Sequence, residues 1–389
     1  MSLVMLRGSM DAAYRAPVPY LTLIATALGA KAESAGWLAI ALSLAGLIAP
    51  VVGVVEARLG RRTMTVIVAG LFILSCTLMP FAPAFTAVLG LYVAVGVAKA
   101  LFTPQVQAFI GESVPFEKRG MAVGFVELSW ALGWVVGVPL FGFLIQRAAW
   151  WTSFLVFAAV GSAGLVAVLR FAMPRSVVQR EGGPSAAAAL LNTASVRAVL
   201  GNGTAVRLLI FDLLIVTTAQ LATVVYAPYL LAHFKLDAEG LGLVSIVLGV
   251  ADVVAELATV ALVDRLGKRR AVLASCSLLA AAFLIVIVLA GALVPMMAGL
   301  FLLFLMFEFA IVAAIVMMSE AVPSARATMG GFGVAVSSLG RIIASAIALP
   351  LFAYGGLTLV MLLGAGLTAL PVVVCWPVRV GQHSSVTPA

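Results

Sequence analysis

The residues best able to do chemistry in this chain are polar and ionisable side chains inside long apolar stretches. A charged side chain at the centre of a membrane helix costs about 2.5–3.5 kcal/mol on insertion scales, so such residues must face protein or water. Carboxylates in this setting can carry protons or attract cations. The candidate residues for a substrate or proton pathway are Asp11, Arg15, Lys99, Glu127, Asp212, Gln220, Asp252, Glu256, Glu308 and Arg341.

Two pairs of these residues are spaced i, i+4, so the members of each pair share one face of a helix. Asp11 and Arg15 form one pair, and Asp252 and Glu256 form the other. Neighbouring carboxylates oppose double ionisation, so one acid of the second pair is expected to take up a proton near neutral pH. This behaviour suits a proton carrier. The alternative is that both carboxylates face a lateral aqueous crevice and only hold water.

Depth along the helices predicts two ion pairs. With a rise of 1.5 Å per residue, Lys99 and Glu127 lie at comparable depths in consecutive predicted helices. Glu308 and Arg341 repeat this arrangement with the charges exchanged. We therefore predict that Lys99 pairs with Glu127 and that Glu308 pairs with Arg341.

The remaining polar candidates have less specific surroundings. Asp212 lies near a helix end, close in sequence to Arg207, so a structural ion pair there competes with a role in substrate binding. Gln220 corresponds to Asp11 in an internal repeat of about 208 residues, so the same polar position is expected in both halves. Cys76, Cys276 and Cys375 lie in apolar segments without metal-ligand spacing and are interpreted as small core residues.

Acids outnumber bases among these intramembrane residues, which favours proton coupling, a cationic or amphipathic substrate, or both. Aromatic side chains occur in or beside the same helices. They could line an apolar binding surface, although helix packing and anchoring at the membrane interface are equally ordinary uses of such residues. These aromatic residues are Trp130, Trp134, Tyr226, Tyr229, Phe307 and Phe309.

The elements that must position these residues are membrane-spanning helices. The chain has 389 residues, of which 64% are hydrophobic and 10% charged, and its mean hydropathy is +1.21. Apolar segments of about 20 residues recur along it, and each can span a bilayer. A β-barrel is excluded because its strands would be shorter and would alternate in polarity. We predict an all-α membrane protein with twelve helices at about 5–28, 36–57, 63–82, 85–110, 120–146, 150–171, 204–230, 240–263, 271–291, 295–318, 328–353 and 356–378.

The chain contains two related halves. Arg58-Leu-Gly-Arg-Arg62 recurs as Arg265-Leu-Gly-Lys-Arg269, and both segments join long apolar stretches. Glu112-Ser-Val-Pro115 recurs as Glu320-Ala-Val-Pro323 at nearly the same offset. We predict six-helix bundles at 1–172 and 204–378, a linker at 173–203 that includes a surface helix near 185–200, and a tail at 379–389. Parallel repeats of this kind suit transporters that bind substrate between the halves.

The distribution of Lys and Arg predicts the topology. Most of them, including Arg7, fall on one side of the predicted helices, whereas Lys31, Arg147 and Lys235 fall on the other. The positive-inside rule then places both termini, the linker and the two basic loops in the cytoplasm. The net charge of +8 is explained by this rule, so no nucleic-acid partner is expected.

Together, the two basic loops and the duplicated six-helix pattern resemble the major facilitator superfamily, whose loop signature is Gly-x-x-x-Asp-Arg-x-Gly-Arg-Arg. The first copy has Ala57 at the acidic position, and the second has Val260 at the first glycine. The resemblance implies two pseudo-symmetric bundles in which the first, fourth, seventh and tenth helices line a cavity. It also implies a cytoplasmic gate formed by Gly53, Glu56, Arg58, Gly60, Arg61, Arg62, Asp264, Arg265, Gly267, Lys268 and Arg269.

A second motif, Gly133-x-x-x-Gly137-x-Pro139, resembles that of drug–proton antiporters in this family. Close helix packing through small residues is the alternative interpretation. The arginine usual in the fourth helix of those antiporters is missing near Leu91 and Tyr92.

We therefore expect a secondary transporter of the inner membrane that exports a small lipophilic or cationic solute in exchange for protons. The alternatives are a nutrient or metabolite importer, a uniporter and a lipid flippase. A membrane sensor or enzyme that keeps this fold without transport is disfavoured. The sequence contains no nucleophile–base pair, metal cluster or phosphate-binding loop, and no extra soluble domain is expected. The expected partners are membrane lipid, a small-molecule substrate and protons. We expect a monomer without a cofactor.

Overall fold

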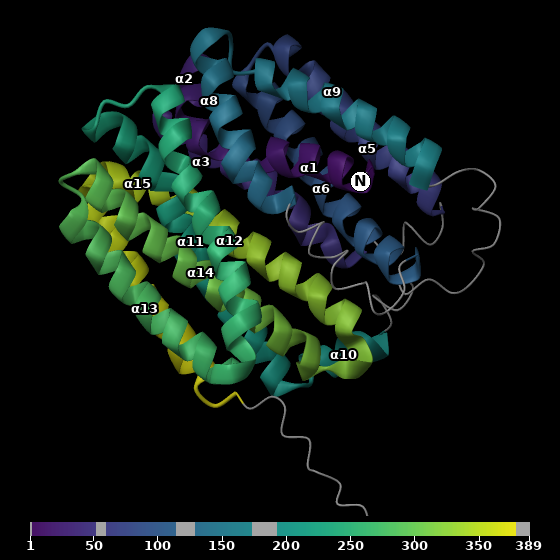
Figure 1. Cartoon of the computed structure of the whole chain (residues 1–389), viewed down its shortest axis with the longest axis vertical. Coiled ribbons are helices and arrows are strands. Elements are labelled where there is room, and N and C mark those ends of the chain that lie inside the picture. The colour runs from purple at the N-terminus through teal and green to yellow at the C-terminus, as the bar shows by residue number, and fades with distance from the viewer. Residues whose placement is uncertain (1, 52–59, 114–128, 173–192, 379–389) are drawn as a thin grey trace, which may run out of the picture.

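The computed structural model describes residues 2–51, 60–113, 129–172 and 193–378, and these residues contain helices and no strands (Figure 1). Nine helices in the described ranges are long and apolar enough to cross a membrane. Large apolar side chains are exposed on their outer faces, and Val260 and Val288 are 84% and 81% exposed. Such surfaces suit contact with lipid rather than water. The predicted all-α membrane fold is confirmed.

The first half of the chain, before residue 173, begins with a broken helix. Pro17 and Pro19 interrupt it, because proline lacks the N–H that continues a helical ladder. The predicted helix 5–28 is therefore three pieces: α1 Ser2–Arg15, a short turn Val18–Tyr20 and α2 Leu21–Ala27. The remaining elements are α3 Ala35–Leu44 with the turn Ala45–Val51, α5 Arg61–Leu78, α6 Phe85–Ser113, the π-helical turn Gly133–Gly137, α8 Val138–Arg147, and α9 Thr152–Ala167 with the turn Val168–Ala172.

The second half begins with a long helix at Gly203, and a short helix precedes it in the predicted linker. The side chains of Asn202 and Asp237 cap the first long helices of this half by accepting hydrogen bonds from backbone N–H groups. The elements are α10 Thr193–Leu200, α11 Gly203–His233, α12 Ala238–Leu266, α13 Lys268–Leu289, α14 Leu293–Ala321 and α15 Arg326–Cys375.

The last element, α15, is two helices rather than one. It has 50 residues, which is far more than the roughly 20 needed to cross a bilayer. Its backbone leaves the helical region at Gly356, where φ is 64°. This break agrees with the predicted helices 328–353 and 356–378. The predicted helices 36–57 and 120–146 extend into residues outside the described ranges, so the count of twelve stays a prediction.

The two basic loops share one backbone conformation at their central glycines. Gly60 has φ 75° and ψ 147°, and Gly267 has φ 81° and ψ 127°. Side chains with a Cβ rarely adopt a positive φ, so glycine is required at both positions. Each glycine immediately precedes a helix, α5 or α13. The repeat seen in the sequence is therefore also a structural repeat at these two residues.

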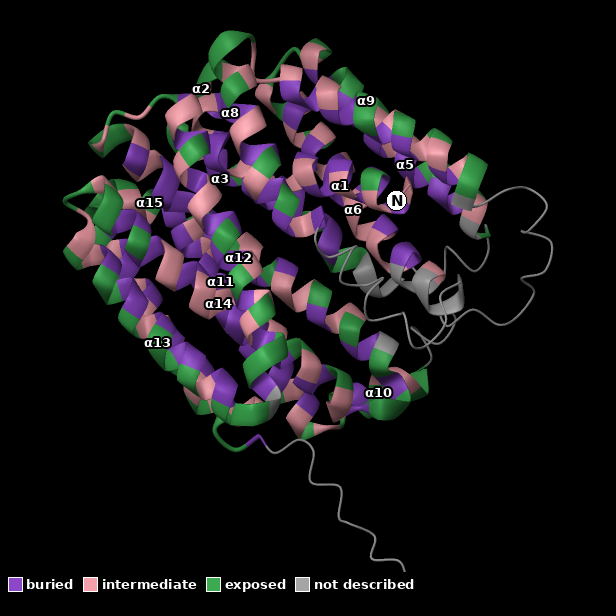
Figure 2. Cartoon of the chain, in the orientation of Figure 1, coloured by how far each residue is buried: buried purple, intermediate pink, exposed green. Residues whose placement is uncertain are grey.

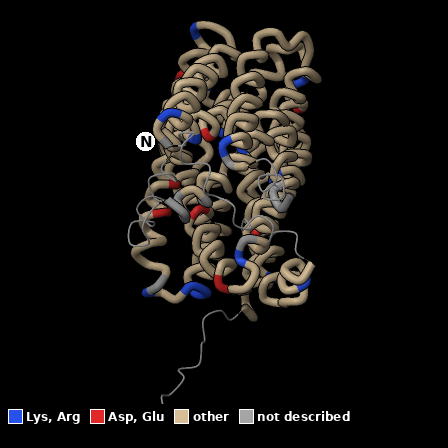
Figure 3. Tube along the Cα trace, turned by 90° about the vertical axis from the view of Figure 1, so that its right-hand side faces the viewer, with Lys and Arg blue, Asp and Glu red and all other residues tan. Residues whose placement is uncertain are grey.

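The two halves lie side by side in Figure 1, the first in purple to blue and the second in teal to yellow. Contacts between them involve α12 against α8 and the Gly133–Gly137 turn, and α15 against α3. Buried residues lie mainly on helix faces turned toward the interior (Figure 2). We call the end of the bundle at Gly60 and Gly267 the loop end, and the end at Arg147 and Glu239 the opposite end. Charged residues occur at both ends and at intermediate depth (Figure 3).

Candidate functional site

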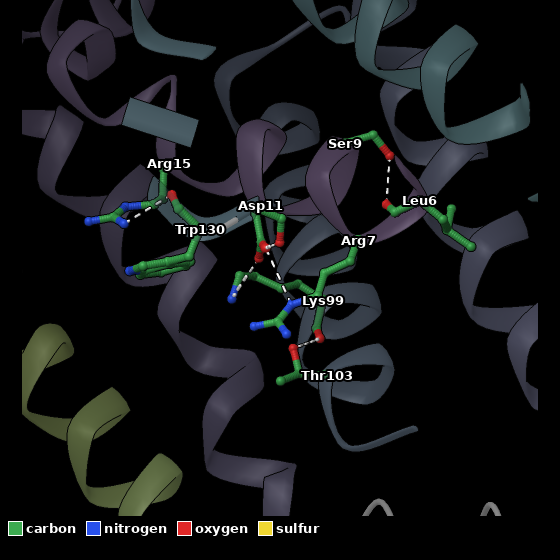
Figure 4. A network of polar contacts seen from close by, with 9 residues as sticks. Leu6, Arg7, Ser9, Asp11, Arg15, Lys99, Thr103 and Trp130 are labelled. Carbon is green, nitrogen blue, oxygen red and sulfur yellow. Dashed lines mark hydrogen bonds and ion pairs between the residues drawn. The ribbon is translucent and has the colours of Figure 1, made fainter. Parts of the chain in front are cut away.

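The first centre of charge inside the bundle is Asp11 on α1 (Figure 4). Its side chain is fully buried. The Ser129 hydroxyl donates a hydrogen bond of 2.8 Å to Asp11 Oδ2. Arg7 Nε lies 3.4 Å from Oδ2, and Lys99 Nζ lies 3.3 Å from Oδ1. A carboxylate with two cations and a hydroxyl donor is well compensated for its removal from water.

Arg7 is a member of this cluster that the sequence interpretation misplaced. It was expected with the loop-side charges, but the structure places it within α1 with 4% exposure. α1 begins at Ser2, so its first turn already lies against other helices. The i, i+4 spacing from Arg7 to Asp11 is a signal that would have found this pair.

Lys99 on α6 contacts Asp11 from the neighbouring helix. Its ammonium also lies 4.3 Å from the ring centre of Trp130 and 4.9 Å from that of Tyr14, within the range of cation–π attraction. The predicted partner, Glu127, lies outside the described residues. The pairing of Lys99 with Glu127 therefore stays untested, and Asp11 is the acid that Lys99 contacts in the structure.

Arg15, one turn beyond Asp11, connects the two halves. Its Nη2 donates to Asp252 Oδ2 of α12 at 2.8 Å, and its Nη1 donates to the Trp130 carbonyl oxygen at 3.2 Å. The guanidinium lies 3.9 Å from the Trp130 ring centre and 5.0 Å from that of Trp134. Asp252 is 1% exposed. This ion pair joins residues 237 positions apart in the chain.

The two carboxylates of α12 are thus not an isolated acid pair, because Asp252 contacts Arg15 from the other half. Glu256 also has an interaction partner. Both acids interact electrostatically with Glu308 of α14, as do Arg15 and Arg341. These side chains of α1, α12, α14 and α15 form one cluster of charges between the halves.

The predicted Glu308–Arg341 ion pair is wrong. Both residues are described, and they interact only at longer range than an ion pair. Neither makes a hydrogen bond or ion pair within the described part of the chain. Equal depth was the basis of the prediction, but side chains at equal depth can still point to different sides of their helices.

Asp212 and Gln220 of α11 contact serines of α15. The Ser337 hydroxyl donates a hydrogen bond of 2.6 Å to Asp212 Oδ2. Gln220 Nε2 donates a hydrogen bond of 3.2 Å to the Ser345 hydroxyl oxygen. Arg341 interacts with Asp212 electrostatically. Asp11 likewise accepts from a serine late in its own half. A buried carboxylate bound by a serine is therefore a feature of both halves.

The Gly133-x-x-x-Gly137 motif packs closely against α1. A Cβ at Gly133 would lie 3.6 Å from the Arg15 side chain, and one at Gly137 would lie 3.3 Å from Ala12. These distances support the interpretation of close packing through small residues. The packing also brings Trp130, which precedes this turn, and Trp134, which lies within it, beside Arg15.

Aromatic rings continue from this cluster into the second half. The Trp134 and Tyr226 ring centres are 6.5 Å apart, and those of Tyr226 and Phe304 are 6.4 Å apart. Tyr226 is fully buried. Trp134 Nε1 is buried without a hydrogen-bond partner among the described residues. The predicted aromatic residues Trp130, Trp134 and Tyr226 therefore lie around the charged cluster.

The basic loop of the second half contacts neighbouring helix ends. Lys268 Nζ lies 2.5 Å from Glu320 Oε1, and Arg269 donates to the Trp376 carbonyl oxygen. Arg265 is exposed. The predicted gate residues Gly53, Glu56 and Arg58 lie outside the described residues. Arg61 and Asp264 lie in α5 and α12, but their side chains are outside the described part of the structure. Arg62 has an interaction partner. The gate role of this set stays a prediction.

Comparison with known proteins agrees with this architecture. The model of the Major Facilitator Superfamily matches residues 3–229 and 208–389. A nucleoside transporter, NupG, has a similar fold, with a TM-score of 0.77 and 13% sequence identity over 97% of this chain and 98% of its own. The human organic anion transporter MFSD10 (TETRAN) has a TM-score of 0.70 and 19% identity over 96% of this chain and 97% of its own.

Curated relatives match shorter stretches. The uncharacterized transporter YceJ of Bacillus subtilis is 31% identical over 40% of each chain. The niacin transporter NiaP of Acinetobacter baylyi is 28% identical over 25% of this chain and 23% of its own. The putative multidrug resistance protein MdtD of Serratia proteamaculans is 36% identical over 19% of this chain and 16% of its own. The matched stretches span less than half of these relatives.

The family match covers both halves of the chain, and the solved structures share its fold over nearly its whole length. The family match indicates a transporter and not an enzyme. The chain belongs to the Major Facilitator Superfamily and is a membrane transporter.

Proposed function

We propose that this transporter exports a small lipophilic or cationic solute in exchange for protons, by alternating access between two six-helix bundles. In this proposal it lies in the inner membrane, with the loop end, both termini and the linker in the cytoplasm. The solute binds at mid-depth between the halves, near the cluster of Arg15, Asp252 and Glu308. The loop end and the opposite end open in turn.

The observation that carries this proposal is the absence of a pairing partner for Glu308 among the described residues. Glu308 is an intramembrane carboxylate of α14 that has no ion-pair or hydrogen-bond partner in the described part of the chain. Two further acids, Asp252 and Glu256, and two bases, Arg15 and Arg341, interact electrostatically with Glu308. Arg15 is already paired with Asp252, so acids outnumber bases in this group. A cationic solute or a proton would supply the missing positive charge.

A second candidate is uptake of a small aromatic carboxylate. The Trp130 ring has two cations close to it, Arg15 at 3.9 Å and Lys99 at 4.3 Å. Indole and guanidinium planes can stack on an aromatic acid, and the two cations would attract its carboxylate. The niacin transporters among the relatives are compatible with this candidate. It requires Arg15 or Lys99 to exchange its present acid for the substrate.

Purified protein in liposomes with an imposed pH gradient distinguishes these functions. The solutes to compare are tetraphenylphosphonium, nicotinate, a sugar and a lysolipid. Export predicts proton movement that depends on the lipophilic cation and accumulation of that cation driven by the gradient. Nicotinate-dependent proton flux would favour the carboxylate carrier instead. A solute that equilibrates without moving protons would make the chain a uniporter and contradict proton coupling.

The variant Glu308→Gln tests the role of Glu308. Glutamine keeps the size of the side chain but removes the charge and the titrating group, so we expect cation accumulation to fall more than ~10-fold, equivalent to about 1.4 kcal/mol. Glu33→Gln is the matched control, because Glu33 is an exposed acid at the opposite end. Gradient-driven accumulation that is equal in both variants would remove Glu308 from the mechanism.

A further inference from the structure

α12 is attached to the first half by two ion pairs. At the opposite end, Arg147 Nη1 lies 2.7 Å from Glu239 Oε2, and at mid-depth Arg15 Nη2 lies 2.8 Å from Asp252 Oδ2. Both acids belong to α12 and both bases belong to the first half. The outer pair is about half exposed, whereas the inner pair is nearly buried. These are the ion pairs between the halves in the described part of the chain.

The surface between these two ion pairs is tightly packed. A Cβ at Gly142 would overlap the backbone oxygen of Ala238, and one at Gly242 would lie 3.0 Å from Pro139 Cα. A Cβ at Gly249 would lie 2.7 Å from the side chain of Trp134. Backbone in such close contact leaves no room for water or solute. Opening the opposite end therefore requires α12 to separate from α8 and from Arg15, which breaks both ion pairs.

Separation affects the two members of the inner pair differently. Arg15 retains its partners in the first half, because it donates to the Trp130 carbonyl and stacks near the Trp130 and Trp134 rings. A guanidinium held by a carbonyl and an indole remains compensated. Asp252, by contrast, loses the cation that Arg15 supplies, and Glu308, with which it interacts in its own half, is another carboxylate.

Among the described residues, no element packed against α12 other than α1 supplies a cation that pairs with Asp252. α14 brings Glu308, and α12 itself carries Glu256 one turn away. α11 brings Tyr226, whose hydroxyl is bonded to Ser245. α8 brings Arg147, which binds Glu239, and α13 carries its bases Lys268, Arg269 and Arg270 at the loop end. Arg341 of α15 is close enough to act on Glu308, but it makes no ion pair with Asp252.

We propose that Asp252 is the proton-coupling residue. When α12 separates from the first half, water at the opposite end reaches Asp252, and a proton from that water forms an O–H bond with its carboxylate. Protonation removes the charge attraction to Arg15 and keeps the opposite end open. When the halves close again, Arg15 approaches, the O–H bond breaks, and the proton leaves toward the loop end. One proton enters per cycle as one solute leaves. The assignment rests on the proposed proton-coupled export and names its coupling site.

The test measures conformation rather than transport. Spin labels or fluorophores are attached at Ala148→Cys and Ala232→Cys, exposed positions at the opposite end in the first and second halves. The native cysteines are buried, so the two introduced thiols take the label. Distances are measured between pH 5 and pH 9 in lipid nanodiscs without solute. We expect the distance between the two labels in the wild type to shift from short to long as pH falls. In Asp252→Asn we expect the molecules with the long distance to outnumber those with the short distance at least 10-fold at every pH.

Two further variants control this result. Asp252→Glu keeps a titrating carboxylate and should retain the pH response. Glu33→Gln removes an exposed acid outside the charged cluster, so the response should also persist. A pH response in Asp252→Asn equal to that of the wild type would overturn the assignment. If the distances behave as expected but liposomes show no solute-dependent proton flux, the proposed export fails while Asp252 remains the group that controls opening.

Discussion

Replacing Asp11 with asparagine is expected to destabilise the folded transporter by about 3–5 kcal/mol, the usual cost of removing one partner from a buried ion pair. The carboxylate is fully buried and binds Arg7, Lys99 and Ser129. Asparagine fills the same volume but removes the buried negative charge that Arg7 and Lys99 both contact. The loss of stability is measured by heating the purified protein and determining by size-exclusion chromatography how much folded protein remains at each temperature.

The compensating variant makes this prediction specific. Adding Lys99→Met to Asp11→Asn removes the ammonium that contacted the lost carboxylate, so the double variant should be more stable than Asp11→Asn alone. Ser129→Ala should cost only about 1–3 kcal/mol, because it removes one neutral hydrogen-bond donor. Equal losses in Ser129→Ala and Asp11→Asn, or no recovery in the double variant, would show that the cations find other partners.

The second large effect is expected from Gly142→Ala. A methyl group there would overlap the backbone oxygen of Ala238 on α12 and the hydroxyl of Tyr20. Backbone atoms cannot move aside as a flexible side chain can, so the halves cannot close at the opposite end. Alanine is a better helix former than glycine by about 1 kcal/mol, so α8 itself is not weakened. We expect the rate of solute transport to fall more than ~10-fold, equivalent to about 1.4 kcal/mol.

The same label pair at Ala148 and Ala232 reports the cause of that loss. Gly142→Ala should show the long, open distance at every pH while its thermal stability stays near that of the wild type. Gly70→Ala in α5 is the matched control, because a Cβ there meets nothing within 4 Å. A Gly142→Ala protein that keeps the short distance and transports within twofold of wild type would contradict the steric argument.

Several features of the fold were predictable from local pattern alone. Apolar segments of membrane-spanning length predicted the helices. The recurrence of the basic loop predicted two related halves, and the similar backbone conformations at Gly60 and Gly267 agree with that. The family resemblance based on these residues is confirmed by the family match. The break between the last two predicted helices is confirmed at Gly356. Such features depend on composition and spacing over short distances, which sequence records directly.

The charged cluster shows the limit of that reasoning. The contact of Lys99 with Asp11 of α1 was not predicted, and the predicted partner, Glu127, lies outside the described residues. Glu308 and Arg341 were paired because their depths agree, yet they make no ion pair. Arg7 was assigned to the loop side, although i, i+4 spacing places it on the face of Asp11. Depth follows from counting residues, but contact also needs the rotation of each helix about its axis.

By itself, the sequence determined that this chain is a duplicated helical membrane protein with ionisable residues held at mid-depth. The hydrophobic effect and the cost of burying charge act on each segment separately, so their signals are local. Tertiary structure alone decided that Arg15 binds Asp252 across the two halves, 237 residues away. That contact depends on how two bundles dock and on the close approach that small residues allow at Gly142, Gly242 and Gly249. No spacing within one segment records which residue of the other half it will meet.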